Sequence, residues 1–267
     1  MVTLSHSPSA VALQETLMLV LEPSAVISSS LKSSWLHLDE KTVMNRIDDL
    51  KSNPNLIDQG ALGLCGEAAF YHHVLQRRPI LFGSMAKILF TDSWGFIGNL
   101  TIHPDPDLLN ANYAAIVAAF PNETMPPQAD WMVLSALRDT ENEVLDFEGT
   151  PGENLAEGSN FQELFEWHLK SNLYTNVTMD ENTDLAHVKT SVLKTANNHI
   201  ALRIKVAMIQ PGSGNHIISL ESPLVIDEVN NQVVFDYWTW GGLVTSPLPM
   251  KLADFSDNYL GAIIAKF

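Results

Sequence analysis

The segment Gln59-Gly60-Ala61-Leu62-Gly63-Leu64-Cys65-Gly66 contains the only cysteine of the chain, and the sequence after it predicts a helix over 66–76. A cysteine attacks a carbonyl group as its thiolate, and the positive end of a helix dipole lowers the pKa of a thiol placed there. Gln59 stands six positions before Cys65, so its carboxamide can donate a hydrogen bond to the oxyanion, with the Cys65 backbone N–H as second donor. The segment therefore predicts a nucleophile, Cys65, and an oxyanion donor, Gln59.

A thiol nucleophile needs an imidazole base that is close in space but not in sequence. A glycine-bearing turn over 212–214 leads through Asn215 into His216 and an apolar run typical of a strand. His216 is therefore the predicted base. The usual role of a histidine is structural, and the rival histidines are His72, His73, His103, His168, His187 and His199. The first two lie about two turns into the nucleophile's own helix, so neither is expected to turn back to Cys65.

A second apolar strand, 232–235, ends at Asp236. The pair Asn230-Asn231 predicts the turn of a hairpin between 223–227 and 232–235, which would return Asp236 to His216. A carboxylate there would fix the imidazole tautomer and stabilise its protonated form, and Trp238 would cover the hydrogen bond. Glu221 and Asp227 lie on or beside the same hairpin and are the alternative acids.

In these segments the chain resembles the papain-like cysteine peptidase superfamily. The Gln-Gly-x-x-Gly-x-Cys-Gly pattern of that superfamily is matched at Gln59, Gly60, Gly63, Cys65 and Gly66. Its histidine begins a strand after a polar residue, as His216 does, and its third residue is Asn or Asp, often with a tryptophan two positions later, as in Asp236-Tyr237-Trp238. The single cysteine, the Asp in third place and the mostly helical insert are more similar to papain-fold toxin and effector enzymes of bacteria.

The resemblance is incomplete at two positions. No tryptophan follows Cys65, and Leu62 stands where secreted papains have a second cysteine. The resemblance implies an α+β, papain-like fold, in which a helical lobe carrying the nucleophile packs against a C-terminal antiparallel β-sheet lobe. We therefore expect an N-terminal helical subdomain over 1–55 and a catalytic domain over 56–267, with its helical lobe at 56–198 and its β-rich lobe at 199–267.

Hydrophobic periodicity and Pro/Gly punctuation predict the individual elements. The expected helices cover 41–51, 66–76, 79–90, 108–120, 131–140 and 160–171. A strand is expected over 200–209, where apolar Leu202, Ile204, Val206 and Met208 alternate with Arg203 and Lys205. It would begin a lobe of three or four strands.

Composition narrows the classes of partner. The chain of 267 residues has 15 basic and 31 acidic residues, a net charge of −16, which repels nucleic acid and anionic membranes. We expect no membrane insertion, because no stretch approaches the roughly 20 apolar residues of a membrane span. The cysteine and histidine spacings suggest neither a metal site nor a cofactor. Met1 to Leu21 contains no Lys or Arg, so we expect a cytoplasmic protein, or one exported without a signal peptide.

The predicted activity is thiol-dependent hydrolysis of protein amide bonds through Cys65, His216, Asp236 and Gln59. Three alternatives stay open: a cysteine protease, a glutamine or asparagine deamidase or amine transferase, and a papain-like scaffold that only binds. An extended groove would favour the first, a narrow well the second, and an occluded or misaligned triad the third. The expected partners are a protein substrate and an immunity or inhibitor protein.

Overall fold

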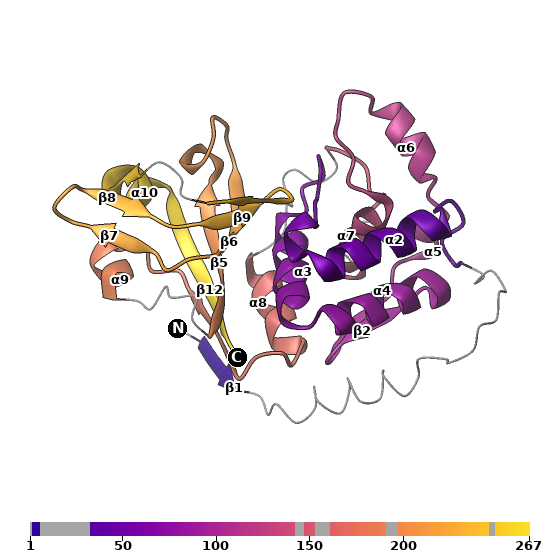
Figure 1. Ribbon diagram of the computed structural model, residues 1–267, viewed down its shortest axis with the longest axis horizontal. Helices are drawn as coiled ribbons and strands as arrows, with labels where there is room; N and C mark the ends of the chain where they lie inside the picture. The colour runs from indigo at the N-terminus through magenta and orange to yellow at the C-terminus, as the bar shows by residue number, and fades with distance from the viewer. Residues whose placement is uncertain (1, 6–32, 142–146, 153–160, 191–196, 246–248) are drawn as a thin grey trace.

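A central helix, α3 (Cys65–Arg77), separates a helical lobe from a β-sheet in the computed structural model (Figure 1). The structure describes residues 2–5, 33–141, 147–152, 161–190, 197–245 and 249–267. Residues 66–75 of α3 are all buried, which is the pattern of a helix enclosed on every side. Arg78 ends the helix because Pro79 disfavours helical geometry in the residue before it.

The helical lobe surrounds α3 with helices close to the predicted bounds. Helix α2 packs on α4 and α7, and α8 lies between α3 and strand β4. The four helices are α2 (Glu40–Ser52), α4 (Pro79–Asp92), α7 (Gln128–Glu141) and α8 (Phe161–Lys170). The predicted first residue of α8, position 160, lies outside the described residues.

The predicted helix over 108–120 is wrong, because two short helices occupy it: α5 (Pro106–Asn110) and α6 (Tyr113–Ala119). Asn112 between them has an extended backbone, and its side chain accepts a hydrogen bond from the Ala115 N–H at 3.1 Å. An asparagine used as an N-cap starts a new helix at this point.

A 7-stranded antiparallel sheet lies beside the helical lobe. In spatial order its strands are β1 (Val2–Ser5), β4 (Asn176–Asp180), β12 (Tyr259–Lys266), β5 (Asn198–Lys205), β6 (Asn215–Leu220), β9 (Tyr237–Thr239) and β10 (Gly242–Val244). Strands β2 (Gly95–Ile97) and β3 (Leu100–Ile102) form a separate hairpin in the helical lobe. The molecule is therefore α+β with antiparallel sheets, as expected.

Two cores lie on opposite faces of the large sheet. Ala201, Ile217 and Ile263 join the core of α3 and the helical lobe. Their strand neighbours Leu202 and Ile218 join a second core on the other face. Alternation along each strand produces this division. The second core is covered by α9 (Leu185–Thr190), α10 (Leu252–Asn258) and a 3-stranded sheet of β11 (Met250–Lys251), β8 (Gln232–Val234) and β7 (Val225–Asp227).

The sheet contains more of the chain than the C-terminal lobe expected over 199–267. Strand β4 comes from the middle of the chain and β1 from its beginning. Within the segment 1–55, residues 2–5 therefore form a strand, whereas α2 shares the core of the helical lobe. The expected strand over 200–209 ends at Lys205, because the Val206 N–H bonds to the Gly214 carbonyl at 2.9 Å and a 3-10 turn, η2 (Val206–Met208), follows.

Histidines fill much of the interface between α3 and the sheet. His168 donates from Nδ1 to the Leu164 carbonyl at 2.7 Å, so its Nε2 accepts from Nδ1 of His73 at 2.9 Å. Nε2 of His73 then accepts from the Ser219 hydroxyl on β6, and the His199 ring stacks on His73 at 4.6 Å. Burial lowers the pKa of His168 to about 4. Burial and the neighbouring imidazoles hold the pKa values of His73 and His199 well below the ordinary value.

His72 makes a second polar contact in the same interface. Its Nδ1 faces the Pro54 carbonyl at 3.1 Å, and its Nε2 faces the Glu221 carboxylate at 3.0 Å. Both ring nitrogens of His72 therefore have a hydrogen-bond partner. Although burial raises the pKa of Glu221, hydrogen bonds from His72 and Gln76 bring it below the ordinary value. This contact connects α3 to the residue that follows β6.

The lowered pKa values of His73, His168 and His199 lead us to predict that the protein loses stability in mild acid. Their pKa values are near 6.5 in the unfolded chain and lower in the folded protein, so the unfolded chain binds more protons below about pH 6.5. Above that pH, the contribution of His168 to the free energy of unfolding is constant. Below it, this contribution decreases by about 1.4 kcal/mol per pH unit, until the pH reaches the folded-state pKa of about 4. We expect the free energy of unfolding, measured with urea, to fall from pH 7 to pH 5.

His168→Gln should reduce this pH slope, although it also lowers stability at pH 7 by removing buried hydrogen bonds. His103→Gln is the control, because His103 is exposed and should leave the wild-type slope unchanged. An unchanged slope in His168→Gln would show that the buried histidines do not cause the pH dependence.

Candidate active site

Cys65 is the first residue of α3 and is partly buried. The N-cap residue, Leu64, has an apolar side chain that cannot accept a hydrogen bond from the helix end. The helix dipole therefore favours an anion at the position of Cys65. Glu67 opposes this effect from the first turn, and Nη1 of Arg138, 3.8 Å from its Oε1, offsets the charge. The position predicted for a nucleophile is confirmed as a helix N-terminus.

Gln59 lies on a loop whose backbone is fixed on both sides. The Gly60 N–H bonds to Asp58 Oδ1 at 2.9 Å, and the Ala61 N–H bonds to the Thr124 carbonyl at 2.7 Å. Gly60 has a φ of +54°, and a Cβ there would lie 2.3 Å from the Thr124 oxygen, so only glycine fits. The Gln59 residue itself is 6% exposed. The loop is therefore rigid where an oxyanion donor would have to be positioned.

An ion pair between α2 and α7, with a buried carboxylate, holds the start of the same loop. Arg46 on α2 binds both carboxylate oxygens of Asp130 on α7, at 2.8 and 2.9 Å. The Asp58 N–H donates to Asp130 at 2.8 Å, and Arg46 also donates to the Leu56 carbonyl. Burial raises the pKa of Asp130, and Arg46 opposes that rise. The start of the Gln59 loop is thus attached to two helices of the helical lobe.

His216 is the second residue of β6 and is 5% exposed. Its Nε2 lies 2.6 Å from Thr239 Oγ1 on β9, and its ring stacks on Trp240 at 4.2 Å with an interplanar angle of 16°. Burial lowers the pKa of His216 to about 4. The imidazole is therefore neutral near pH 7, so it can accept a proton but supplies no positive charge to a thiolate.

Contacts between α3 and β6 indicate that the start of the helix, at Cys65, and the start of the strand, beside His216, lie toward the same edge of the molecule. Gln76 bonds to Glu221, and His73 bonds to Ser219, so the helix and the strand run in the same direction. From His73 back to Cys65 the helix spans about 12 Å. From Ser219 back to His216 the strand spans about 10 Å, so the two residues lie at a similar level.

The side chain of His216 leaves β6 on the face away from α3. Ile217 and Ser219 contact the α3 core, whereas Ile218, which alternates with them, belongs to the second core. The ring of His216 is joined to the helical lobe through the β9–β10 turn instead. Trp240 stacks on it, and the next residue, Gly241, lies so close to Asp58 that an added Cβ would be 2.7 Å from the Asp58 Cβ.

Asp236 is not brought to His216, so the predicted third residue of the triad is wrong. The Asp236 carbonyl accepts from the Glu221 N–H at 2.9 Å, and its N–H donates to Ser222 Oγ at 2.7 Å. Five residues of strand, about 16 Å, separate Glu221 from His216. The hairpin at Asn230-Asn231 forms as predicted, but its strands β7 and β8 belong to the 3-stranded sheet.

The alternative acids and the predicted covering tryptophan also lie elsewhere. Glu221 pairs with His72, and Asp227 accepts hydrogen bonds within its own turn, from Val229 and Asn230. Trp238 stacks on His72 at 4.3 Å and donates to the Asn55 carbonyl, so Trp240 covers His216 in its place.

The sequence alone does not single out Thr239 and Trp240. Strand β9 pairs with β6 in a register that sets Trp238 opposite Ser219, so the neighbour of His216 must follow Trp238 in the chain. A three-residue strand gives too little alternation to reveal that register. The one sequence feature that could have drawn attention to Thr239 is its position between two tryptophans, Trp238 and Trp240.

Among the described residues, no group of three or more His, Cys, Asp or Glu side chains is arranged to hold a metal ion. Within that same part of the chain, no helix is both long enough and apolar enough to cross a membrane. No family model matches the chain, and neither a curated protein nor a solved structure matches it.

The contact between His216 and Thr239 predicts which substitution disturbs the imidazole. Thr239→Val keeps the side-chain shape but leaves the buried Nε2 without its partner, so the ring nitrogen NMR signals of His216 should shift. Such a loss typically costs about 1–3 kcal/mol of stability. Asp236→Ala should leave the His216 signals unchanged. The opposite result, a shift in Asp236→Ala alone, would restore the acid to the site.

Proposed function

We propose that the protein is a thiol-dependent amide hydrolase, with Cys65 as nucleophile, His216 as base and Gln59 as oxyanion donor. The reaction is that of a papain-like cysteine protease, and the fold is proposed to be papain-like in arrangement. The observation that carries the proposal is the common end of α3 and β6: one element begins with the cysteine, and the other begins beside the histidine. Because the His216 side chain leaves β6 on the face away from α3, the proposed proton transfer has to pass around the edge of β6 beside the β9–β10 turn.

The environment of His216 supports a defined role for each ring nitrogen. If Nε2–H donates to Thr239, Nδ1 carries the lone pair of the neutral ring, and this lone pair can take the proton of a thiol. The pKa of His216, about 4, leaves its imidazole neutral at rest, so the ring can accept the thiol proton during the attack. Thr239 orients the ring in place of the predicted acid, but its hydroxyl carries no charge to stabilise an imidazolium.

The chemical steps follow from these roles. Nδ1 of His216 takes the Cys65 proton while Sγ bonds to the carbonyl carbon, and the Gln59 carboxamide and the Cys65 N–H stabilise the oxyanion. The imidazolium then gives its proton to the departing amine, and the C–N bond breaks to leave a thioester. Water, deprotonated by His216, attacks the thioester and releases the carboxylic acid and the thiol.

A second candidate activity, deamidation of a protein side chain, is favoured by the burial of the site. Gln59 and His216 are 6% and 5% exposed, which leaves little surface for an extended peptide and so favours a smaller group over a peptide chain. The same thioester forms from a glutamine or asparagine side chain, with ammonia as the leaving group. The displaced Asp236 favours the third alternative, a scaffold that binds without catalysis.

The biological setting is proposed by the same resemblance. We infer a bacterial toxin or effector that acts on a protein of a target cell, either in the cytoplasm or after export by a route independent of a signal peptide. The producing cell would then hold an immunity or inhibitor protein against it.

The decisive experiment compares proteins exposed to the wild-type enzyme and to Cys65→Ala. Mass spectrometry should show products only with the wild type: new chain termini for a protease, or an amide-to-acid mass change for a deamidase. Identical spectra, from folded samples of both proteins and across several cell extracts, would overturn the enzymatic proposal and leave the binding scaffold.

Removal of the oxyanion donor should lower turnover without unfolding the protein. We expect Gln59→Ala to lose roughly 10- to 1,000-fold in turnover, the range for a single oxyanion donor. The control is Gln210→Ala, which changes an exposed glutamine outside the site and should retain full activity. Thermal unfolding of both variants checks the fold. Unchanged turnover in Gln59→Ala would remove this residue from the mechanism.

A further inference from the structure

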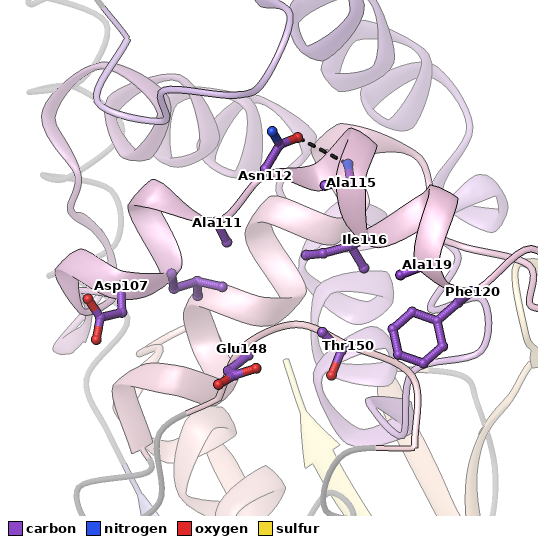
Figure 2. A pocket seen from close by; sticks show the side chains of 10 residues that line it. Asp107, Ala111, Asn112, Ala115, Ile116, Ala119, Phe120, Glu148 and Thr150 are labelled. Carbon is purple, nitrogen blue, oxygen red and sulfur yellow. Dashed lines mark hydrogen bonds between the residues drawn. The ribbon is translucent and has the colours of Figure 1, made fainter.

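An elongated apolar pocket lies on the helical lobe, lined by none of the proposed catalytic residues. It has a volume of about 500 Å³, within the usual range of ligand sites. Helices α5 and α6 form one wall and the segment 147–152 the other (Figure 2). Its lining residues are Asp107, Leu108, Ala111, Asn112, Ala115, Ile116, Ala119, Phe120, Glu148 and Thr150.

Helix α6 extends this apolar surface beyond the pocket. The sequence of the helix, Tyr-Ala-Ala-Ile-Val-Ala-Ala, contains no charged residue, and the helix projects from the lobe in Figure 1. Outside the pocket lining, Ala114 and Ala118 are exposed, and Val117 is 40% exposed. An apolar helix on a protein surface is a mark of an interaction site, because its exposure to water is unfavourable.

Two carboxylates define the chemistry of the occupant. Figure 2 shows Asp107 on α5 and Glu148 on the opposite wall toward one end, with Phe120 at the other. Both acids are exposed. A segment with apolar side chains and a Lys or Arg at one end therefore complements the pocket in both polarity and charge. The net charge of −16 adds a long-range attraction for a basic partner.

We propose that this pocket, the α5–α6 pocket, is a docking site for a basic, apolar segment of a partner protein. The lining extends along the chain from α5 across all of α6, a shape suited to a peptide segment. The apolar contacts with Ile116 and Phe120 supply the affinity, and the acids select the basic residue and its direction. The pocket is spatially distinct from the proposed hydrolase site, because Cys65, His216 and Gln59 do not line it.

The test measures peptide binding to the full chain carrying Cys65→Ala, so that hydrolysis cannot reduce the signal. Fluorescence anisotropy would compare three labelled 12-residue peptides: one of Leu and Lys, one of Leu and Glu, and one of Ser and Lys. We expect only the Leu/Lys peptide to bind, with an affinity that falls as salt rises. The combined change Asp107→Asn and Glu148→Gln should weaken it about fivefold and reduce the salt dependence.

Two further variants separate the pocket from general acidity and from misfolding. Glu123→Gln removes an exposed acid that does not line the pocket and should bind as the parent does. Ile116→Ser should abolish binding, with circular dichroism as the check that the helices remain. Equal binding of the Leu/Lys and Ser/Lys peptides, or no effect of the Asp107/Glu148 variant, would overturn the proposal. Self-association of the chain that Ile116→Ser abolishes would assign the surface to a second copy instead.

Discussion

The burial of α3 between two layers is the constraint on which the rest of the molecule depends. A helix enclosed on every side cannot present a polar stripe to water, so its polar side chains must find partners within the interface. His72 bonds to Glu221, whereas His73 joins a neutral chain that ends at Ser219. These contacts fix the direction of α3 against β6. They also fix which end of the sheet the first residue of the helix approaches.

That alignment sets the candidate site and limits its chemistry. The helix N-terminus favours a negative sulfur, and the buried imidazole is a weak base without charge. Such a pair resembles a general-base mechanism more than a preformed thiolate–imidazolium pair. Rigid support comes from the Arg46–Asp130 ion pair under the Gln59 loop. The helical lobe therefore holds the proposed nucleophile and the proposed oxyanion donor, whereas the sheet holds the proposed base.

Much of the fold could be predicted from local sequence. The polar contacts between neighbouring strands of the sheet could not be predicted in this way. The helix after Cys65 and the hairpin at Asn230-Asn231 were predictable because proline, glycine and apolar periodicity act over a few residues. The placement of Asp236 failed because it depends on which sheet the hairpin joins, a choice made by contacts distant in sequence. Thr239 was hidden for the same reason: its place beside His216 follows from the β6–β9 register alone.

The hydrogen bond between Ala61 and Thr124 connects the two ends of the helical lobe in a further way. Thr124 lies on the segment that leaves α6, and Ala61 is two residues from Gln59. A ligand that displaces α6 would therefore act on the backbone beside Gln59, the proposed oxyanion donor. Thermodynamic linkage makes such an effect mutual, so a substrate held by Gln59 would change the affinity at α6 by the same factor. In this chain, the proposed docking pocket and the proposed oxyanion donor are connected by one short piece of backbone.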